Sequence, residues 1–145
     1  MNPEFIKYLE AIGMKSPLID RVKKIYEFYE EILPNEITDI FVEDYLDGNG
    51  SRNYQNLWFF SEKYIMESKS FISTDDFDIT PIKSKIEYVR VRKQYYDIGH
   101  TTEKSRLNLE FGMDTKAGGD VKASKENCEY LWKIATKYVY HNLKK

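Results

Sequence analysis

The sequence holds few of the residues that mark several large classes of protein. Its single cysteine, Cys128, excludes an intramolecular disulfide framework and a zinc site of paired cysteines, which favours a reducing compartment. No apolar run approaches the roughly 20 residues that a membrane-spanning helix needs, and the first residues lack the basic and then apolar order of a signal peptide. We therefore expect a cytoplasmic protein without a transmembrane segment.

The chain also lacks a large excess of charge of one sign. It has 22 Lys and Arg against 24 Asp and Glu, a net charge of −2. The charges are divided unevenly, since residues 36–80 carry 3 basic and 10 acidic side chains and residues 81–145 carry 14 basic and 8 acidic ones. This division predicts a dipolar molecule rather than a general binder of polyanions.

Two helices are predicted in the first 34 residues. Asn2 before Pro3 and Ser16 before Pro17 are typical helix starts, because proline is tolerated at the first helical position. Pro34 ends the second helix. Apolar residues recur at helical spacing in both segments: Phe5, Ile6, Leu9, Ile12, then Leu18, Val22, Ile25, Tyr29 and Ile32. We interpret residues 1–34 as a helical hairpin and residues 35–145 as an α+β unit, with one compact domain as the alternative.

From residue 36 the pattern changes to that of strands rich in aromatic and β-branched residues. The predicted strands are Ile37–Leu46, Asn56–Ser61, Tyr64–Ser68, Phe77–Ile79, Ile86–Lys93, Leu107–Phe111 and Val121–Ala123. Asp47–Ser51 and Gly118–Asp120 are predicted turns. Ser124 is predicted to cap a final amphipathic helix whose apolar flank includes Leu131 and Trp132 and extends to Leu143.

The order of these elements resembles the pleckstrin-homology-like (PH-like) superfold from Glu36 to about Lys145. Three strings carry the resemblance: Leu57–Met66, Ile79–Ile82 before the Ile86–Lys93 strand, and Gly119–Ser124 before the last helix. The resemblance implies a bent antiparallel sheet or barrel of six or seven strands, closed by the C-terminal helix. The alternative is an NTF2-like cup with the first helices inside a curved sheet, so the sequence leaves open on which side those helices pack.

Candidate catalytic and metal-binding residues are few. His100 lies in a polar loop beside Asp97 and is interpreted as an exposed loop residue; as the alternative, it stands near the pocket mouth of a small enzyme or ligand-binding cup. Cys128 is interpreted as a core residue and the Asp75–Asp78 segment as a solvated acidic loop. The GxSxG, HExxH, GxxxxGK[ST] and GxGxxG motifs are absent. We therefore predict no catalytic residue, no metal and no cofactor.

The PH-like resemblance raises the question of phosphoinositide binding. Family members that grip inositol phosphates use Lys and Arg in and beside the first hairpin loop, because clustered cations must neutralise several phosphates. Here the loop after Glu43 and Asp44 carries Asp47 and the single cation Arg52. This departure argues against a phosphoinositide partner.

Basic residues gather in the second half of the chain. Arg90, Arg92 and Lys93, with Arg106, are the candidate binding residues. Together with nearby tyrosines they could bind a nucleic acid, but the sequence pI near 5.8 argues against one. Pairing with the acidic Ile37–Leu46 strand would explain the same residues structurally. We predict a non-catalytic interaction module whose aromatic residues contact a protein or peptide partner.

Overall fold

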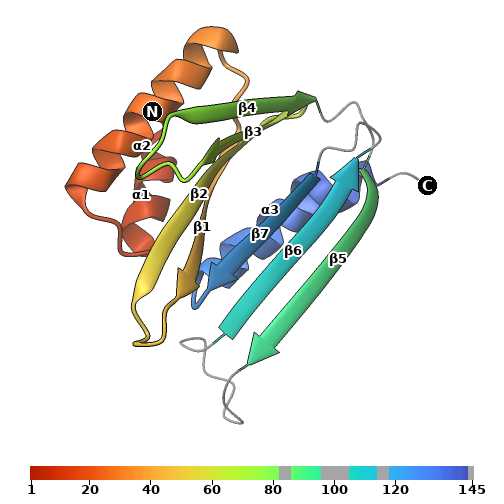
Figure 1. Ribbon diagram of the computed structural model, residues 1–145. Coiled ribbons are helices and arrows are strands. Elements are labelled where there is room, and N and C mark those ends of the chain that lie inside the picture. Colours follow the sequence, from red (N-terminus) through yellow and green to blue (C-terminus); the bar gives the residue numbers. More distant parts are fainter. Residues whose placement is uncertain (82–85, 96–104, 114–117, 144–145) are drawn as a thin grey trace.

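The computed structural model describes residues 1–81, 86–95, 105–113 and 118–143 and contains three α-helices and seven strands (Figure 1). The helices are α1 (Pro3–Ala11), α2 (Ser16–Ile32) and α3 (Asn127–Ile134). The strands are β1 (Asp39–Leu46), β2 (Arg52–Phe60), β3 (Tyr64–Lys69), β4 (Asp76–Pro81), β5 (Ile86–Tyr95), β6 (Ser105–Met113) and β7 (Gly118–Ser124). None of the helices in the described residues is long and apolar enough to cross a membrane.

The strands form two antiparallel sheets, with the orders β1-β2-β3-β4 and β5-β6-β7. The predicted α+β class and antiparallel arrangement are therefore confirmed. The first hairpin turns where the sequence predicts it, because the Asp47 carboxylate accepts hydrogen bonds from the backbone N–H groups of Asn49 (2.8 Å) and Ser51 (3.0 Å). Gly50 takes the positive φ of 78° in this turn, which glycine adopts without steric cost.

Helices α1 and α2 pack on one face of the first sheet, as Figure 1 shows. The rings of Tyr26 and Tyr29 from α2 lie 6.0 and 5.3 Å from the ring of Phe59 on β2. The neighbouring Phe60 points to the other face, since successive strand residues alternate, and its ring stacks at 5.0 Å on Tyr138, after α3. The N-terminal helices thus cover one side of the first sheet. On the other side, Phe60 packs against the residues that follow α3.

Within the described residues the two sheets do not close into the barrel expected from the sequence, because side chains occupy the edge of β1. The Val42 N–H donates to the Tyr8 hydroxyl at 2.9 Å, and the Asn127 amide donates to the Val42 carbonyl at 2.8 Å. Tyr8 in turn donates to Asn127 Oδ1 at 2.8 Å. These side chains thus provide partners for the backbone N–H and carbonyl groups of Val42, at the edge where a ladder with β7 would otherwise form.

The predicted turn at Gly118–Asp120 is wrong, since these residues belong to β7. Gly119 lies so close to the Phe111 ring that an added Cβ would stand 2.7 Å from it, so glycine serves close packing here and not a turn. Ser124 is likewise not the helix cap that its position suggests. It ends β7, and its backbone N–H donates to Asp44 Oδ1 at 3.0 Å.

The last helix is shorter than the apolar pattern predicts. After Ile134 the chain continues as a π-helical turn at Ala135–Val139 and a 3₁₀ turn at Tyr140–Asn142. Leu131 is fully buried as expected, but Trp132 is 48% exposed. Of these two flank residues, Leu131 thus faces the core and Trp132 faces the surface.

Candidate functional site: a basic cleft between the two sheets

A row of polar side chains crosses the second sheet. Arg92 on β5 stands opposite Asn108 on β6, and Asn108 stands opposite Lys122 on β7. Arg106 precedes Asn108 by two residues and shares its face, since side chains alternate along a strand. The other face carries the buried Leu109 and its neighbours packed toward α3. The alternation of apolar and polar residues thus places three cations on the face that α3 leaves open.

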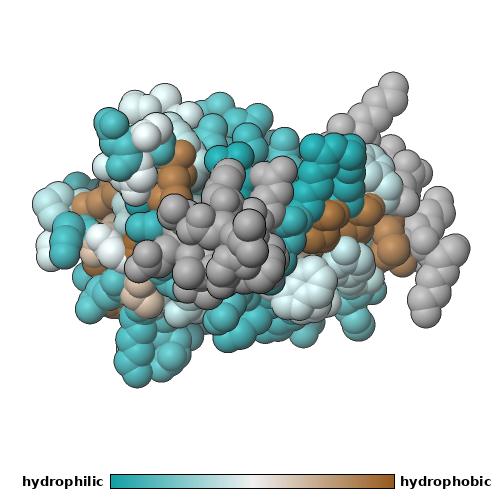
Figure 2. All heavy atoms as spheres, turned by 90° about the horizontal axis from the view of Figure 1, so that it is seen from below, coloured by the Kyte–Doolittle hydropathy of each residue, from teal (hydrophilic) through white to brown (hydrophobic). Residues whose placement is uncertain are grey.

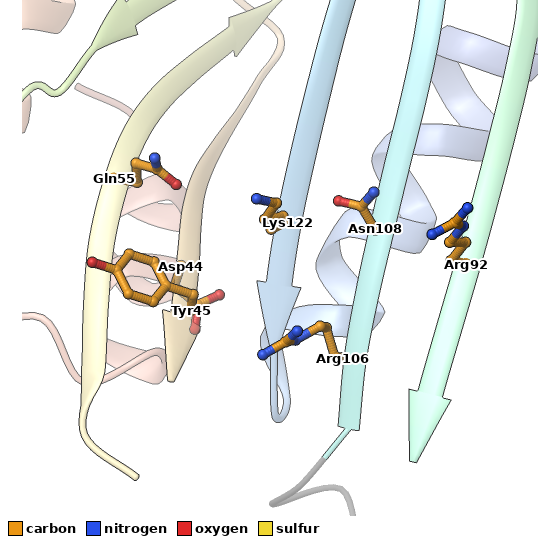
Figure 3. Close-up of a pocket in the computed structure, with 7 residues that line it drawn as sticks. All are labelled: Asp44, Tyr45, Gln55, Arg92, Arg106, Asn108 and Lys122. Carbon is orange, nitrogen blue, oxygen red and sulfur yellow. The ribbon is translucent and has the colours of Figure 1, made fainter. Parts of the chain in front are cut away.

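These side chains line a cleft of about 440 Å³ that also reaches β1 and β2 (Figure 3). In Figure 3 the Lys122 amine and the Arg106 guanidinium point toward the first sheet. The cleft is lined by Asp44, Tyr45, Gln55, Arg92, Arg106, Asn108 and Lys122. It therefore joins residues that lie up to 78 positions apart in the sequence.

The Asp44 carboxylate anchors one wall of the cleft. Its side chain is fully buried, and it accepts hydrogen bonds from the Asn127 amide at 2.7 Å and from both the backbone N–H and the hydroxyl of Ser124. It also forms an ion pair with Arg52, whose Nε lies 2.9 Å away. Asp44 is thus neutralised by its neighbours, so its charge does not offset the exposed cations of the cleft.

Arg52 connects this wall to the ends of two helices. Its guanidinium pairs with Glu126 at 2.7 Å, before α3, and donates to the carbonyl oxygen of Ile12, after α1. Burial works against the charge, but the bond to Glu126 and the attraction of Asp44 outweigh it and raise the pKa of Arg52. The one cation of the predicted first loop region is therefore structural.

Glu43 lies beside the cleft and is 2% exposed. It accepts hydrogen bonds from the Asn56 amide at 2.7 Å and from the Trp58 indole at 3.4 Å. Burial raises its pKa to about 7, although these bonds and one from the backbone of Lys122 oppose the rise. Glu43 thus ties β1 to β7 through a carboxyl group that titrates near neutral pH.

The cations of the cleft are accessible. Arg92 and Lys122 are exposed and Arg106 is half-buried. Among the described residues, neither Arg92 nor Lys122 forms an ion pair. The cleft therefore presents positive charge to solvent beside the amide groups of Gln55 and Asn108, an arrangement suited to carboxylate or phosphate oxygens.

The structure separates the four predicted binding residues into three settings. Arg92 and Arg106 line the cleft together. Arg90 shares the face of Arg92 but stands opposite Glu110 on β6, outside the cleft lining. Lys93 lies on the opposite face, in a groove beside α3. The suggested pairing of this strand with Ile37–Leu46 is wrong, because β5 pairs with β6 and belongs to a different sheet from β1.

The other candidates of the sequence are placed as follows. His100 lies outside the described residues. Cys128 is buried, and burial raises the pKa of its thiol to about 11, so the reactive thiolate is disfavoured. Asp75, in the acidic segment, pairs with Arg21 at 2.7 Å.

Apart from Arg106, sequence reasoning missed the cleft residues outside the basic strand. Lys122 and Asn108 could have been found from the polar positions of alternating strands, once the order β5-β6-β7 was assumed. Tyr45 and Gln55 carry no such signal, because they reach the cleft from the other sheet. Only the packing of the two sheets brings them to it.

Comparisons with known proteins show a likeness of fold to one solved structure and no family. No family model matches the sequence, and no curated protein matches it. Among solved structures, the chain is similar to the C-terminal domain of an unknown protein from Leishmania infantum, with a TM-score of 0.50 and 7% sequence identity. The match covers 81% of this chain and 97% of that domain, and it is a likeness of fold alone.

Proposed function

We propose that the chain is a non-catalytic interaction module and that its basic cleft binds acidic side chains of a protein partner. The observation that carries this proposal is that Arg92 and Lys122, which form no ion pair among the described residues, lie beside Arg106 in a cleft whose single lining carboxylate, Asp44, is already neutralised. A cluster of this kind attracts two or more carboxylates at once and steers their approach.

The surroundings of the cleft favour protein side chains over a long nucleic acid. Tyr45 is 41% exposed beside the cations, and aromatic residues of this kind are enriched at the centres of protein interfaces. The acidic residues 36–80 supply most of the first sheet and would repel an extended polyanion. A short acidic segment would be attracted by the local cations alone.

The absence of catalysis in this proposal rests on the chemistry of the described cleft residues. None of them combines a nucleophile with a neighbouring base, and the Asp44 carboxylate is held by Arg52, Ser124 and Asn127. We further propose that the fold is PH-like. The four-plus-three order of antiparallel strands and the helix that follows the last strand support this assignment.

Binding of a labelled hexaglutamate peptide tests the proposed site. At low salt the wild type should bind with an affinity that falls steeply as salt is raised, because cation–carboxylate contacts are screened. The double variant Arg92→Gln, Lys122→Gln should lose at least about tenfold in affinity, which corresponds to roughly 1.4 kcal/mol. Its melting temperature should stay within a few degrees of the wild type, since both side chains are exposed.

The matched control removes one cation far from the cleft. Lys24→Gln changes an exposed residue of α2 and should leave the affinity unchanged. Equal losses in Lys24→Gln and in a single Lys122→Gln variant would mean that net charge, and not the cleft, attracts the peptide. Tighter binding of a single-stranded oligonucleotide than of hexaglutamate would reject the proposed class of partner.

A further inference from the structure

Among the described residues, the β5 edge of the second sheet is open, and an apolar groove lies beside it on the face opposite to the basic cleft. Strand β5 is the outermost strand of its sheet and pairs with β6 on one side. On its other side, the described residues contribute a single parallel bridge between Ile86 and Leu143. Within the described residues, the backbone from Tyr88 to Arg92 therefore offers hydrogen-bonding groups to an added strand.

The groove lies under this edge, between α3 and the β5 and β6 strands, and has a volume of about 550 Å³. Figure 2 shows hydrophobic residues reaching the surface between hydrophilic ones on the side of the second sheet. The groove is lined by Val91, Lys93, Leu107, Cys128, Glu129, Trp132 and Lys133. Trp132, with its 48% exposure, gives it a large aromatic wall of the kind that anchors interfaces.

The two sides of the open edge differ in chemistry. Val91 points toward the groove, whereas Arg90 and Arg92 lie on the opposite face and are exposed. An added strand would alternate in the same way, so every second side chain would enter the groove. The side chains between them would lie beside Arg90 and Arg92, where carboxylates are favoured.

These charges argue against a second copy of the chain as the occupant. In a two-fold antiparallel pairing of β5 with itself, centred at residue 90, 91 or 92, an arginine stands opposite Arg90 or Arg92 of the other copy. Like charges directly opposite one another destabilise a strand pair. In these three registers the edge disfavours self-association, and the two arginines favour an acidic partner strand instead.

We propose that the open edge of β5 accepts an extended segment of a partner protein in which acidic and apolar residues alternate. The segment adds a fourth strand to the second sheet. Its apolar side chains pack against Val91, Leu107 and Trp132, and its carboxylates lie beside Arg90 and Arg92. Main-chain hydrogen bonds supply affinity, and the alternation of side chains supplies specificity.

This surface shares Arg92 with the basic cleft, but variants of its other residues affect this surface alone. Trp132 and Val91 do not line the cleft, and Arg90 lies outside it as well. Hexaglutamate, the probe of the cleft, has no apolar side chains for the groove. Loss of binding to one probe with retention of the other therefore separates the two proposals.

A synthetic eight-residue peptide that alternates valine and glutamate tests the proposal, measured by calorimetry with the full chain. Two control peptides are used: one with the same composition but the valines and glutamates in separate blocks, and one with alternate backbone nitrogens methylated. We expect the alternating peptide to bind at least tenfold more tightly than either control. Equal binding of the methylated peptide would overturn strand addition, because it cannot complete the ladder.

Two variants and one physical readout complete the test. Trp132→Ala and Arg90→Gln should each weaken binding of the alternating peptide by about three- to thirtyfold while leaving hexaglutamate binding unchanged. Binding should also slow the exchange of backbone amide protons in β5. Unchanged affinity in both variants, or a stable wild-type dimer in sedimentation at the working concentration, would reject the proposed occupant.

Discussion

The Tyr8 hydroxyl donates a 2.8 Å hydrogen bond to Asn127 Oδ1, which joins the first helix of the chain to the last. Both residues also bind the backbone of Val42, so the pair holds α1, α3 and β1 together. The pair is buried, and burial raises the pKa of Tyr8 well above its ordinary value. The hydroxyl thus stays neutral and available as both donor and acceptor.

Removal of this hydroxyl should destabilise the fold. Tyr8→Phe leaves the Val42 N–H and Asn127 Oδ1 buried without their partner, which costs about 1–3 kcal/mol. Urea unfolding measures the change. Tyr64→Phe is the control, because the Tyr64 hydroxyl has no hydrogen-bond partner among the described residues, and its effect should be near zero. Equal effects in the two variants would contradict the role assigned to Tyr8.

Gly119 should not tolerate a side chain. In Gly119→Ala the new Cβ would stand 2.7 Å from the Phe111 ring and 3.0 Å from the Trp58 ring, both buried, so the sheets must shift at a cost of about 1–3 kcal/mol. Gly48→Ala is the matched control, since no atom lies within 4 Å of the place that an added Cβ would take there. A thermal melt that places both variants at the same temperature would refute the packing explanation.

Stability should depend on pH through Glu43. Its pKa is about 7 in the fold against an ordinary 4.5, so the folded state holds this proton more tightly than the unfolded state. The contribution of Glu43 to the free energy of unfolding is therefore fully present below about pH 4.5. It declines as the pH rises to about 7 and is lost above that pH. Glu67, whose pKa burial also raises to about 7, adds a slope in the same direction.

Substitution by the neutral isostere isolates the Glu43 contribution. Glu43→Gln should be more stable than the wild type at pH 8 by up to about 3 kcal/mol, at 1.36 kcal/mol per pKa unit, and should differ little near pH 4.5. Denaturant unfolding across pH 4.5–8 measures the difference. The variant should retain the slope due to Glu67 alone, and a slope identical to that of the wild type would exclude Glu43 as a titrating group.

Loss of the Arg52 guanidinium should be costly. Arg52→Met leaves the fully buried Asp44 carboxylate without its cation, a change worth about 3–5 kcal/mol. Lys63→Met is the comparison, because its ion pair with Glu36 is exposed and 3.9 Å long, and such pairs contribute about 0–1 kcal/mol. Circular dichroism during chemical unfolding distinguishes the two. A small effect for Arg52 would mean that Ser124 and Asn127 alone satisfy Asp44.

The local elements of this protein can be predicted from its sequence because their signals are local. Pro3 and Pro17 lie in the first turns of α1 and α2, and the Asp47–Ser51 turn depends on bonds between residues four or fewer positions apart. The period-two alternation of Leu107 and its neighbours predicts β6 and its buried face. The antiparallel α+β class follows from such patterns.

Tertiary structure alone decided how these elements meet. Side chains of Tyr8 and Asn127, 119 residues apart, satisfy the β1 edge and leave the sheets unclosed. The cleft likewise joins Asp44 to Lys122, and Gly119 serves close packing against Phe111 instead of a turn. Periodicity cannot predict these features, because each depends on contacts between elements that are distant in the chain, and such contacts override local preference.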